Sequence, residues 1–134
     1  PAQHVVPGGV LATLGRTLLP VAALIGAYLV YAGADRPGGA FQGGTVIAAA
    51  LLVAVLGGAW RPAPVNARRW RLVIVAGPAA FLAVGVLGLA FGQGFLFLPP
   101  AVAGAAILAI EVALAASIAV TLAFLVLGAP EAER

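Results

Sequence analysis

The chain has 134 residues, of which 63% are hydrophobic and only 8% are charged, with a formal net charge of +3. Soluble domains average about 45–50% apolar and about 25% charged residues, so this composition excludes an ordinary soluble domain and indicates an integral membrane protein. Cysteine is absent, and the single histidine, His4, has no carboxylate nearby in the sequence, so we expect no disulfide, no metal site and no cofactor. Because the chain begins at Pro1, we expect the native start to lie upstream.

Four apolar windows predict an all-α integral membrane protein with four transmembrane helices. An apolar run of about 20 residues crosses the hydrocarbon core as a helix. The connections between the runs are short, so we expect helices that follow one another in sequence to be antiparallel neighbours. One membrane domain covering residues 1–134 would contain all four spans, at about 14–32, 43–60, 72–91 and 101–127.

The arginines predict the orientation of these spans. Cytoplasmic loops of membrane proteins carry an excess of positive residues, and tryptophan rings settle at the headgroup level, where Trp60 and Trp70 flank the middle connection. The opposite side holds only Arg36, next to Asp35. Both termini are therefore expected in the cytoplasm, and this topology explains the basic residues without nucleic acid. The residues expected on the cytoplasmic side are Arg16, Arg61, Arg68, Arg69 and Arg71.

Proline and small residues suggest how the helices pack. Pro20 and Pro78 are expected near helix beginnings, where a missing N–H matters least. Small side chains let helix backbones approach closely in a membrane. Such residues recur on the third span at Gly85, Gly88 and Gly92, and at every fourth position of the last span, at Ala101, Ala105, Ala109, Ala113, Ser117 and Thr121.

Glu111 is the only ionisable residue deep within any expected span. A buried acid is costly in a membrane and usually faces a partner or water. One interpretation gives Glu111 a role in cation or proton movement, with Ser117 and Thr121 as further candidates for an ion path. The other is a protonated acid bonded to a backbone carbonyl. Because Glu111 points away from the small-residue stripe, we expect neighbouring subunits to cover one of the two faces.

The sequence "RPGGAFQGG" connects the first two spans. Pro37 ends the first helix, and Gly38 and Gly39 allow a sharp reversal. Gly43 and Gly44 start the second helix with bare backbone, which permits another helix to approach, while Phe41 and Gln42 are presented to neighbours. The stretch lacks the lysine and serine or threonine of a phosphate-binding loop. We expect Gly43→Leu to disrupt a larger complex before it changes the number of spans.

Residues 33–52, "GADRPGGAFQGGTVIAAALL", resemble the small MnhB-type (MrpB-like) component of the multisubunit Mrp/Mnh cation/proton antiporters. That family has a hallmark close to G-H-x-x-P-G-G-G-F-Q-G-G. The preceding stretch resembles the first helix of the family, including Arg16, Pro20, Gly26 and Tyr28. Three positions depart from the pattern: Ala34 replaces the histidine, Ala40 replaces a glycine, and Ser117 stands where the last helix has aspartate. The matching residues are Pro37, Gly38, Gly39, Phe41, Gln42, Gly43 and Gly44.

The resemblance implies an accessory membrane subunit that supports assembly, rather than an enzyme. Its partners would be other membrane subunits that exchange sodium or another cation for protons, including larger antiporter-like subunits, in a bacterial or archaeal cell (inner) membrane. If the family aspartate serves ion passage, Glu111 has taken over its role or the role is lost. An alternative is a structural subunit of a complex I-related redox or substrate-converting complex. A third is an independent homo-oligomeric exporter.

Overall fold

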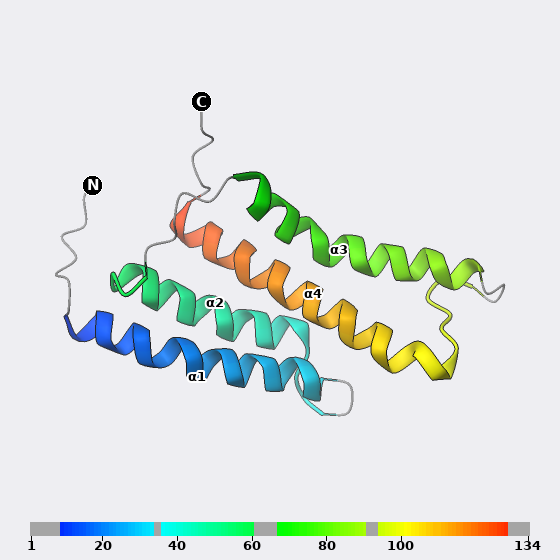
Figure 1. The fold of residues 1–134 in the computed structure, drawn as a ribbon, viewed down its shortest axis with the longest axis horizontal. Coiled ribbons are helices and arrows are strands. Elements are labelled where there is room, and N and C mark those ends of the chain that lie inside the picture. The colour runs from blue at the N-terminus through cyan, green and yellow to red at the C-terminus, as the bar shows by residue number, and fades with distance from the viewer. Residues whose placement is uncertain (1–8, 34–35, 61–66, 91–93, 129–134) are drawn as a thin grey trace.

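The computed structural model describes residues 9–33, 36–60, 67–90 and 94–128. The expectations for His4, Ala34, Asp35, Arg61 and Gly92 concern residues outside these ranges. All regular elements in the described ranges are α-helices, shown in Figure 1. They are α1 (Val10–Ala32), α2 (Ala40–Leu56), α3 (Ala67–Ala90) and α4 (Pro100–Leu127).

Three of the four helices, α1, α3 and α4, are long and apolar enough to cross a membrane. The second expected span is shorter, because α2 has 17 residues. At 1.5 Å per residue it is about 25 Å long, less than the roughly 30 Å of the hydrocarbon core. Glycine limits its length, since α2 ends before Gly57 and Gly58, and Gly58 has a φ of 71°. The 28 residues of α4 extend about 42 Å by the same rise.

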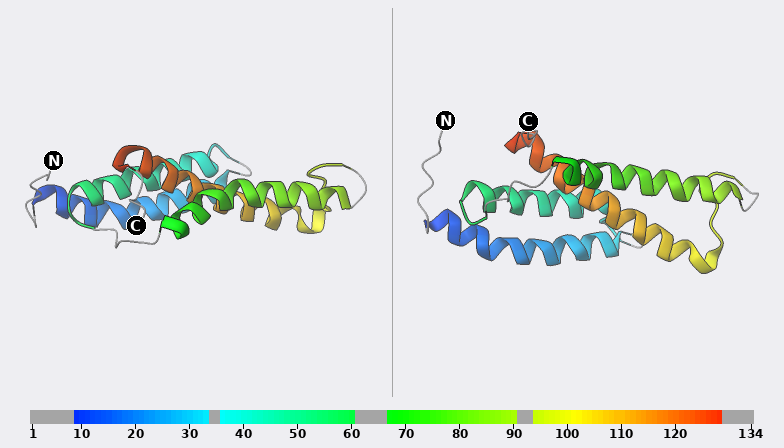
Figure 2. Two further views of the ribbon diagram at one scale, coloured as in Figure 1. Left: turned by 90° about the horizontal axis from the view of Figure 1, so that it is seen from above. Right: turned by 45° about the horizontal axis from the view of Figure 1, so that its top comes forward.

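The helices do not pack in sequence order. α1 packs on α2, α2 packs on α4, and α4 packs on α3. The expectation of sequential neighbours is therefore correct for two pairs and wrong for α2 and α3, because α4 lies between them (Figure 2). Among the described helices, α3 contacts α4 alone.

Glycines let α1 and α2 approach to backbone contact. A Cβ added at Gly15 would lie 2.8 Å from the Cα of Ala54, which is closer than real Cβ contacts allow. Gly26 and Gly43 face each other further along: a Cβ on either would lie 3.0 Å or less from the carbonyl oxygen of the other. The close approach expected at Gly43 is thus made with α1 of the same chain.

The central helix α4 uses different faces for its two neighbours. A Cβ on Gly44 of α2 would lie 2.8 Å from the carbonyl oxygen of Ala115, and a Cβ on Gly77 of α3 would lie 2.8 Å from the Cβ of Ser117. Both faces of α4 thus have contacts within the chain, but neither is fully covered, so the expectation that neighbouring subunits cover one of them stays a prediction. The small-residue stripe packs only in part, because its first three members, Ala101, Ala105 and Ala109, are exposed.

The two prolines lie inside helices rather than near their beginnings. The expectation failed because α1 starts at Val10 and α3 at Ala67, several residues before the apolar windows from which the spans were read. A proline at an interior position cannot donate to the carbonyl four residues earlier. For Pro78 that carbonyl belongs to Ile74, and the hydroxyl of Ser117 donates to it from α4. The interior proline therefore creates an acceptor that an interhelical hydrogen bond satisfies.

The two hairpins of the fold are staggered. Gly39, which precedes α2, lies beside Glu111 of α4, so the turn of the α1–α2 hairpin is level with Glu111. Residues 100–110 of α4 continue past this turn for about 16 Å at the helical rise. Figure 1 shows the α3–α4 hairpin extending beyond the α1–α2 turn at this end.

Candidate functional site

The glycine-rich turn is fixed by the backbone at the end of α1. The N–H of Gly39 donates to the carbonyl oxygen of Leu29 at 2.8 Å. A Cβ on Gly38 would lie 2.5 Å from the same oxygen, so this position has no room for a side chain. Gly39 has a φ of 117° and a ψ of −175°, a region that is essentially restricted to glycine. Pro37 is exposed at the start of the turn.

The first turn of α2 starts without a side-chain cap, because Gly39 occupies the N-cap position. The N–H of Gly43 donates to the carbonyl of Gly39 and is the first to bond within the helix. The backbone N–H groups of Ala40, Phe41 and Gln42 precede it and have no acceptor in their own helix. Together they make the start of α2 a region of positive potential.

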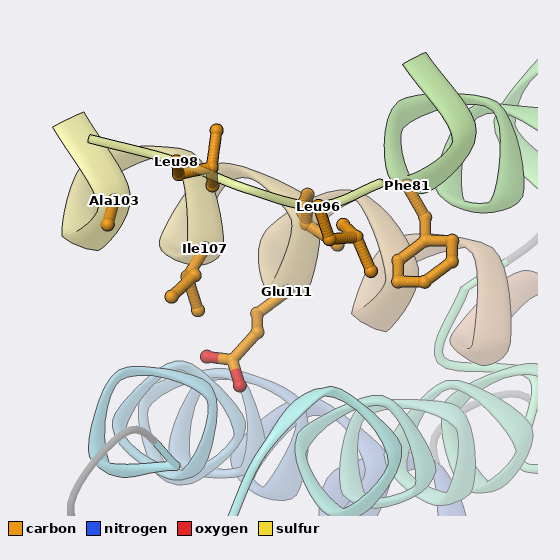
Figure 3. Close-up of a pocket in the computed structure, with 7 residues that line it drawn as sticks. Phe81, Leu96, Leu98, Ala103, Ile107 and Glu111 are labelled. Atoms are coloured by element: carbon orange, nitrogen blue, oxygen red, sulfur yellow. The ribbon is translucent and has the colours of Figure 1, made fainter. Parts of the chain in front are cut away.

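The carboxylate of Glu111 lies at this uncapped helix start. Its Oε1 is 3.9 Å from the point that a Cβ on Gly39 would occupy, and the Oε1 of Gln42 is 3.7 Å from the same point. Figure 3 shows the Glu111 side chain pointing away from α4 toward the α1–α2 hairpin. Negative groups are favoured near a helix N-terminus by the exposed N–H groups and the helix dipole. The structure thus brings the glycine-rich motif and Glu111, which are 67 or more residues apart in sequence, to one place.

Glu111 also borders a recess on the side of the stagger. The recess has a volume of about 400 Å³ and is lined mainly by apolar residues of the α3–α4 hairpin. Glu111 is half-buried there and is the only charged residue in the lining. No hydrogen bond or ion pair joins its carboxylate to another residue in the part of the chain that the structure describes. The other lining residues are Phe81, Leu96, Leu98, Ala103, Ile107 and Ile110.

Ser117 and Thr121 lie together, but apart from Glu111. Ser117 is buried, with 6% of its surface exposed, and its hydroxyl donates to the carbonyl of Ile74 on α3. The Thr121 hydroxyl donates to the Ser117 carbonyl at 2.7 Å, one turn back on the same helix. At about 100° per residue, Glu111 and Ser117 point about 120° apart around α4. The three ion-path candidates therefore do not form one polar line in this chain.

Two features of this region were missed by sequence reasoning. Gly77 was not recognised as a contact with α4, and the Ile74 carbonyl was not recognised as an acceptor. If the third span had been extended in the N-terminal direction through "ARRW" to Ala67, Pro78 would have been placed inside the helix. The Ile74 carbonyl would then have been recognisable as an acceptor. The closeness of Gly39 to Glu111 has no local signal, because it depends on α2 packing against α4.

The arrangement can accept a proton or a cation at one carboxylate. Within the described ranges there is no group of three or more histidine, cysteine, aspartate or glutamate side chains that could hold a metal ion. Continuous proton transfer needs a chain of titratable groups, so further groups would have to come from other chains.

Comparison with protein families matches residues 10–130 to a domain related to the MnhB subunit of Na+/H+ antiporter. No curated protein and no solved structure matches the chain. The matched range contains all four helices, the glycine-rich turn and Glu111. Because the match covers most of the sequence, the chain belongs to the MnhB-related family of membrane proteins.

Proposed function

We propose that the chain is an accessory membrane subunit of a multisubunit complex that exchanges Na+ for protons. The family match supports this function, and the three span-length helices support a multi-pass membrane location. Its partners are other membrane subunits, including larger antiporter-like subunits that supply the remaining titratable groups. We assign it to a bacterial or archaeal cell membrane, with both termini in the cytoplasm on the side of Arg68, Arg69 and Arg71.

The observation that supports a role in ion movement is the position of Glu111 beside Gly39. A carboxylate at the turn of a hairpin, next to uncapped N–H groups and a recess, can exchange a proton or a cation with groups outside the chain. The hydroxyls of Ser117 and Thr121 already donate to carbonyl oxygens. Glu111 is therefore the residue that borders the ion path, and the two hydroxyl residues support the helices around it.

Glu111→Gln tests this role in the complete complex. The substitution keeps the size and hydrogen-bonding capacity of the side chain but removes its titratable proton. We expect an unchanged set of subunits, measured by mass spectrometry of the purified complex, and a lower rate of Na+-driven proton movement in everted membrane vesicles. Thr121→Val is the control, since its hydroxyl bonds only within α4. An unchanged antiport rate in the Glu111→Gln complex contradicts the proposed role.

The orientation can be tested with single cysteines, because these 134 residues contain none. An impermeant maleimide added outside intact cells should label Pro100→Cys, at the exposed start of α4. It should label Arg68→Cys only after the membrane is permeabilised. The reverse pattern shows the opposite orientation.

A further inference from the structure

Aromatic residues mark one boundary of the membrane, so the depth of the α1–α2 turn in the membrane can be measured from that boundary. Trp70 packs edge-to-face on Phe124, with ring centroids 5.6 Å apart. Trp60 lines the same small apolar recess as both rings. Tryptophan side chains settle at the headgroup level, and Arg69 and Arg71 beside them are exposed. We take the level of Phe124 on α4 as this boundary.

Glu111 lies far from that boundary but short of the opposite one. It precedes Phe124 by thirteen residues on α4, a distance of about 20 Å along the helix. The hydrocarbon core is about 30 Å thick, so the turn beside Glu111 ends about 10 Å short of the other boundary. A tilted helix covers less of the membrane thickness, so tilt increases the distance between Glu111 and the opposite boundary. Gly39 and the carboxylate of Glu111 are therefore within the hydrocarbon region.

Lipid cannot cover a turn at this depth. Irregular backbone inside the hydrocarbon region is tolerated only where protein buries it or water surrounds it. The first three N–H groups of α2 and the carboxylate of Glu111 all need polar partners there. The choice is therefore between a water-filled opening and another protein segment.

The walls of the recess favour protein. We call this recess the step: its apolar walls are Phe81, Leu96, Leu98, Ala103 and Ile107, and Glu111, which lies beside Gly39, is at its edge. Figure 3 shows these apolar side chains on the α3–α4 hairpin and its connection, with the carboxylate at one edge. Water in the recess would leave the apolar walls hydrated, which is unfavourable. An apolar helix would bury the walls and pack closely against them.

We propose that a transmembrane helix of a companion subunit occupies the step and directs one basic or amide side chain to Glu111. An apolar surface with a single unpaired carboxylate is complementary to an apolar helix with a single donor. Arginine, lysine or a side-chain amide supplies such a donor. The proposal rests on the proposed function for the existence of companion subunits, and it adds the surface and the chemistry of the contact.

Photocrosslinking within the complete complex tests the occupant. A diazirine-bearing residue replaces Ile107 in the step, and the same residue replaces Leu24 on α1 as the control, since Leu24 is 73% exposed and outside the step. We expect an adduct between position 107 and one companion subunit, and no adduct to that subunit from position 24. Adducts only to lipid, or to a second copy of this chain, overturn the proposal.

Cysteine labelling tests the water-filled alternative independently. In the assembled complex, Ala103→Cys should react poorly with an impermeant maleimide and should become reactive when the subunit is separated in detergent. Ready labelling in the intact complex overturns the proposal. A crosslink at position 107 combined with normal antiport by Glu111→Gln would contradict the proposed ion role and leave the docking inference standing, so the two failures are distinguishable.

A charge reversal tests the contact at Glu111. Glu111→Lys should cause loss of the crosslinked companion from the purified complex, because it places two donors together in a site without an acceptor. Glu111→Gln should retain the companion, since its amide oxygen still accepts a hydrogen bond. Equal retention of the companion by both variants overturns the assignment of a donor to that helix.

Discussion

Pro78 and Ser117 provide a hydrogen bond between α3 and α4 that double mutation can isolate. In an uninterrupted helix, the N–H of residue 78 would donate to the carbonyl of Ile74, but proline has no N–H. The hydroxyl of Ser117 donates to that carbonyl instead. We expect Ser117→Ala to leave the Ile74 carbonyl without this partner and to weaken the contact between the two helices.

The size of the effect follows from burial. Interhelical hydrogen bonds in membrane proteins average about 0.6 kcal/mol in double-mutant cycles and reach about 1.7 kcal/mol. Because Ser117 is only 6% exposed, water cannot readily replace its hydroxyl, so we expect a cost of about 1.5 kcal/mol, near the upper value. In a Pro78→Ala background the restored N–H donates to Ile74, and the same Ser117→Ala change should cost less than about 0.5 kcal/mol.

The fluorescence of Trp70 can report this contact, since its ring packs on Phe124 across the α3–α4 interface. The second tryptophan, Trp60, is replaced by phenylalanine, and unfolding of the detergent-purified protein is followed as SDS is added. Thr121→Val is the control, because the Thr121 hydroxyl bonds to the carbonyl of its own helix. Equal costs for Ser117→Ala with proline and with alanine at position 78 would refute the reasoning.

Two glycine substitutions give further predictions. Gly39→Ala should destabilise the fold by about 1–3 kcal/mol, because a φ of 117° is strained for alanine. Space is not the cause, since the nearest atom to a Cβ at this position is 3.7 Å away. The SDS concentration at the midpoint of unfolding measures the effect, and an unchanged midpoint counts against the strained turn. Gly43→Leu should separate α1 from α2, whereas Ala49→Leu on the exposed face of α2 should not. The SDS midpoint should fall for Gly43→Leu and stay unchanged for Ala49→Leu, and equal midpoints in the two variants contradict the prediction.

The sequence predicted the helical class and the glycine-rich turn because both depend on local properties. Apolar runs determine where helices form, and Pro37 with the glycines that follow determines where α1 ends and the chain reverses. Helix boundaries were less accurate, since hydropathy marks apolar residues and α3 begins at "ARRW", which is polar in part. The short α2 was missed for a related reason: its apolar window continues to Trp60, but Gly57 and Gly58 end the helix.

The candidate site was predicted as separate parts. Glu111 was recognisable because an acid within an apolar run is costly, and the motif was recognisable from its glycines. Their contact depends on α4 packing beside α2, with Gly44 against Ala115. Alanine and glycine are spread over all four helices, so composition does not show which helix takes which neighbour. The non-local packing order was therefore outside the reach of the sequence.

The central place of α4 also has a consequence for synthesis in the cell. Chains emerge from the ribosome N-terminus first, so α1 and α2 can pair while the rest is still being made. When α3 follows, neither of these helices offers it a packing surface, since its contacts among the described helices are with α4 alone. α3 must therefore wait in the membrane, unattached to the first hairpin, until the last helix has been made. A chain truncated within α4 would leave α3 without its packing partner. The last segment to be translated therefore commits the subunit to its fold.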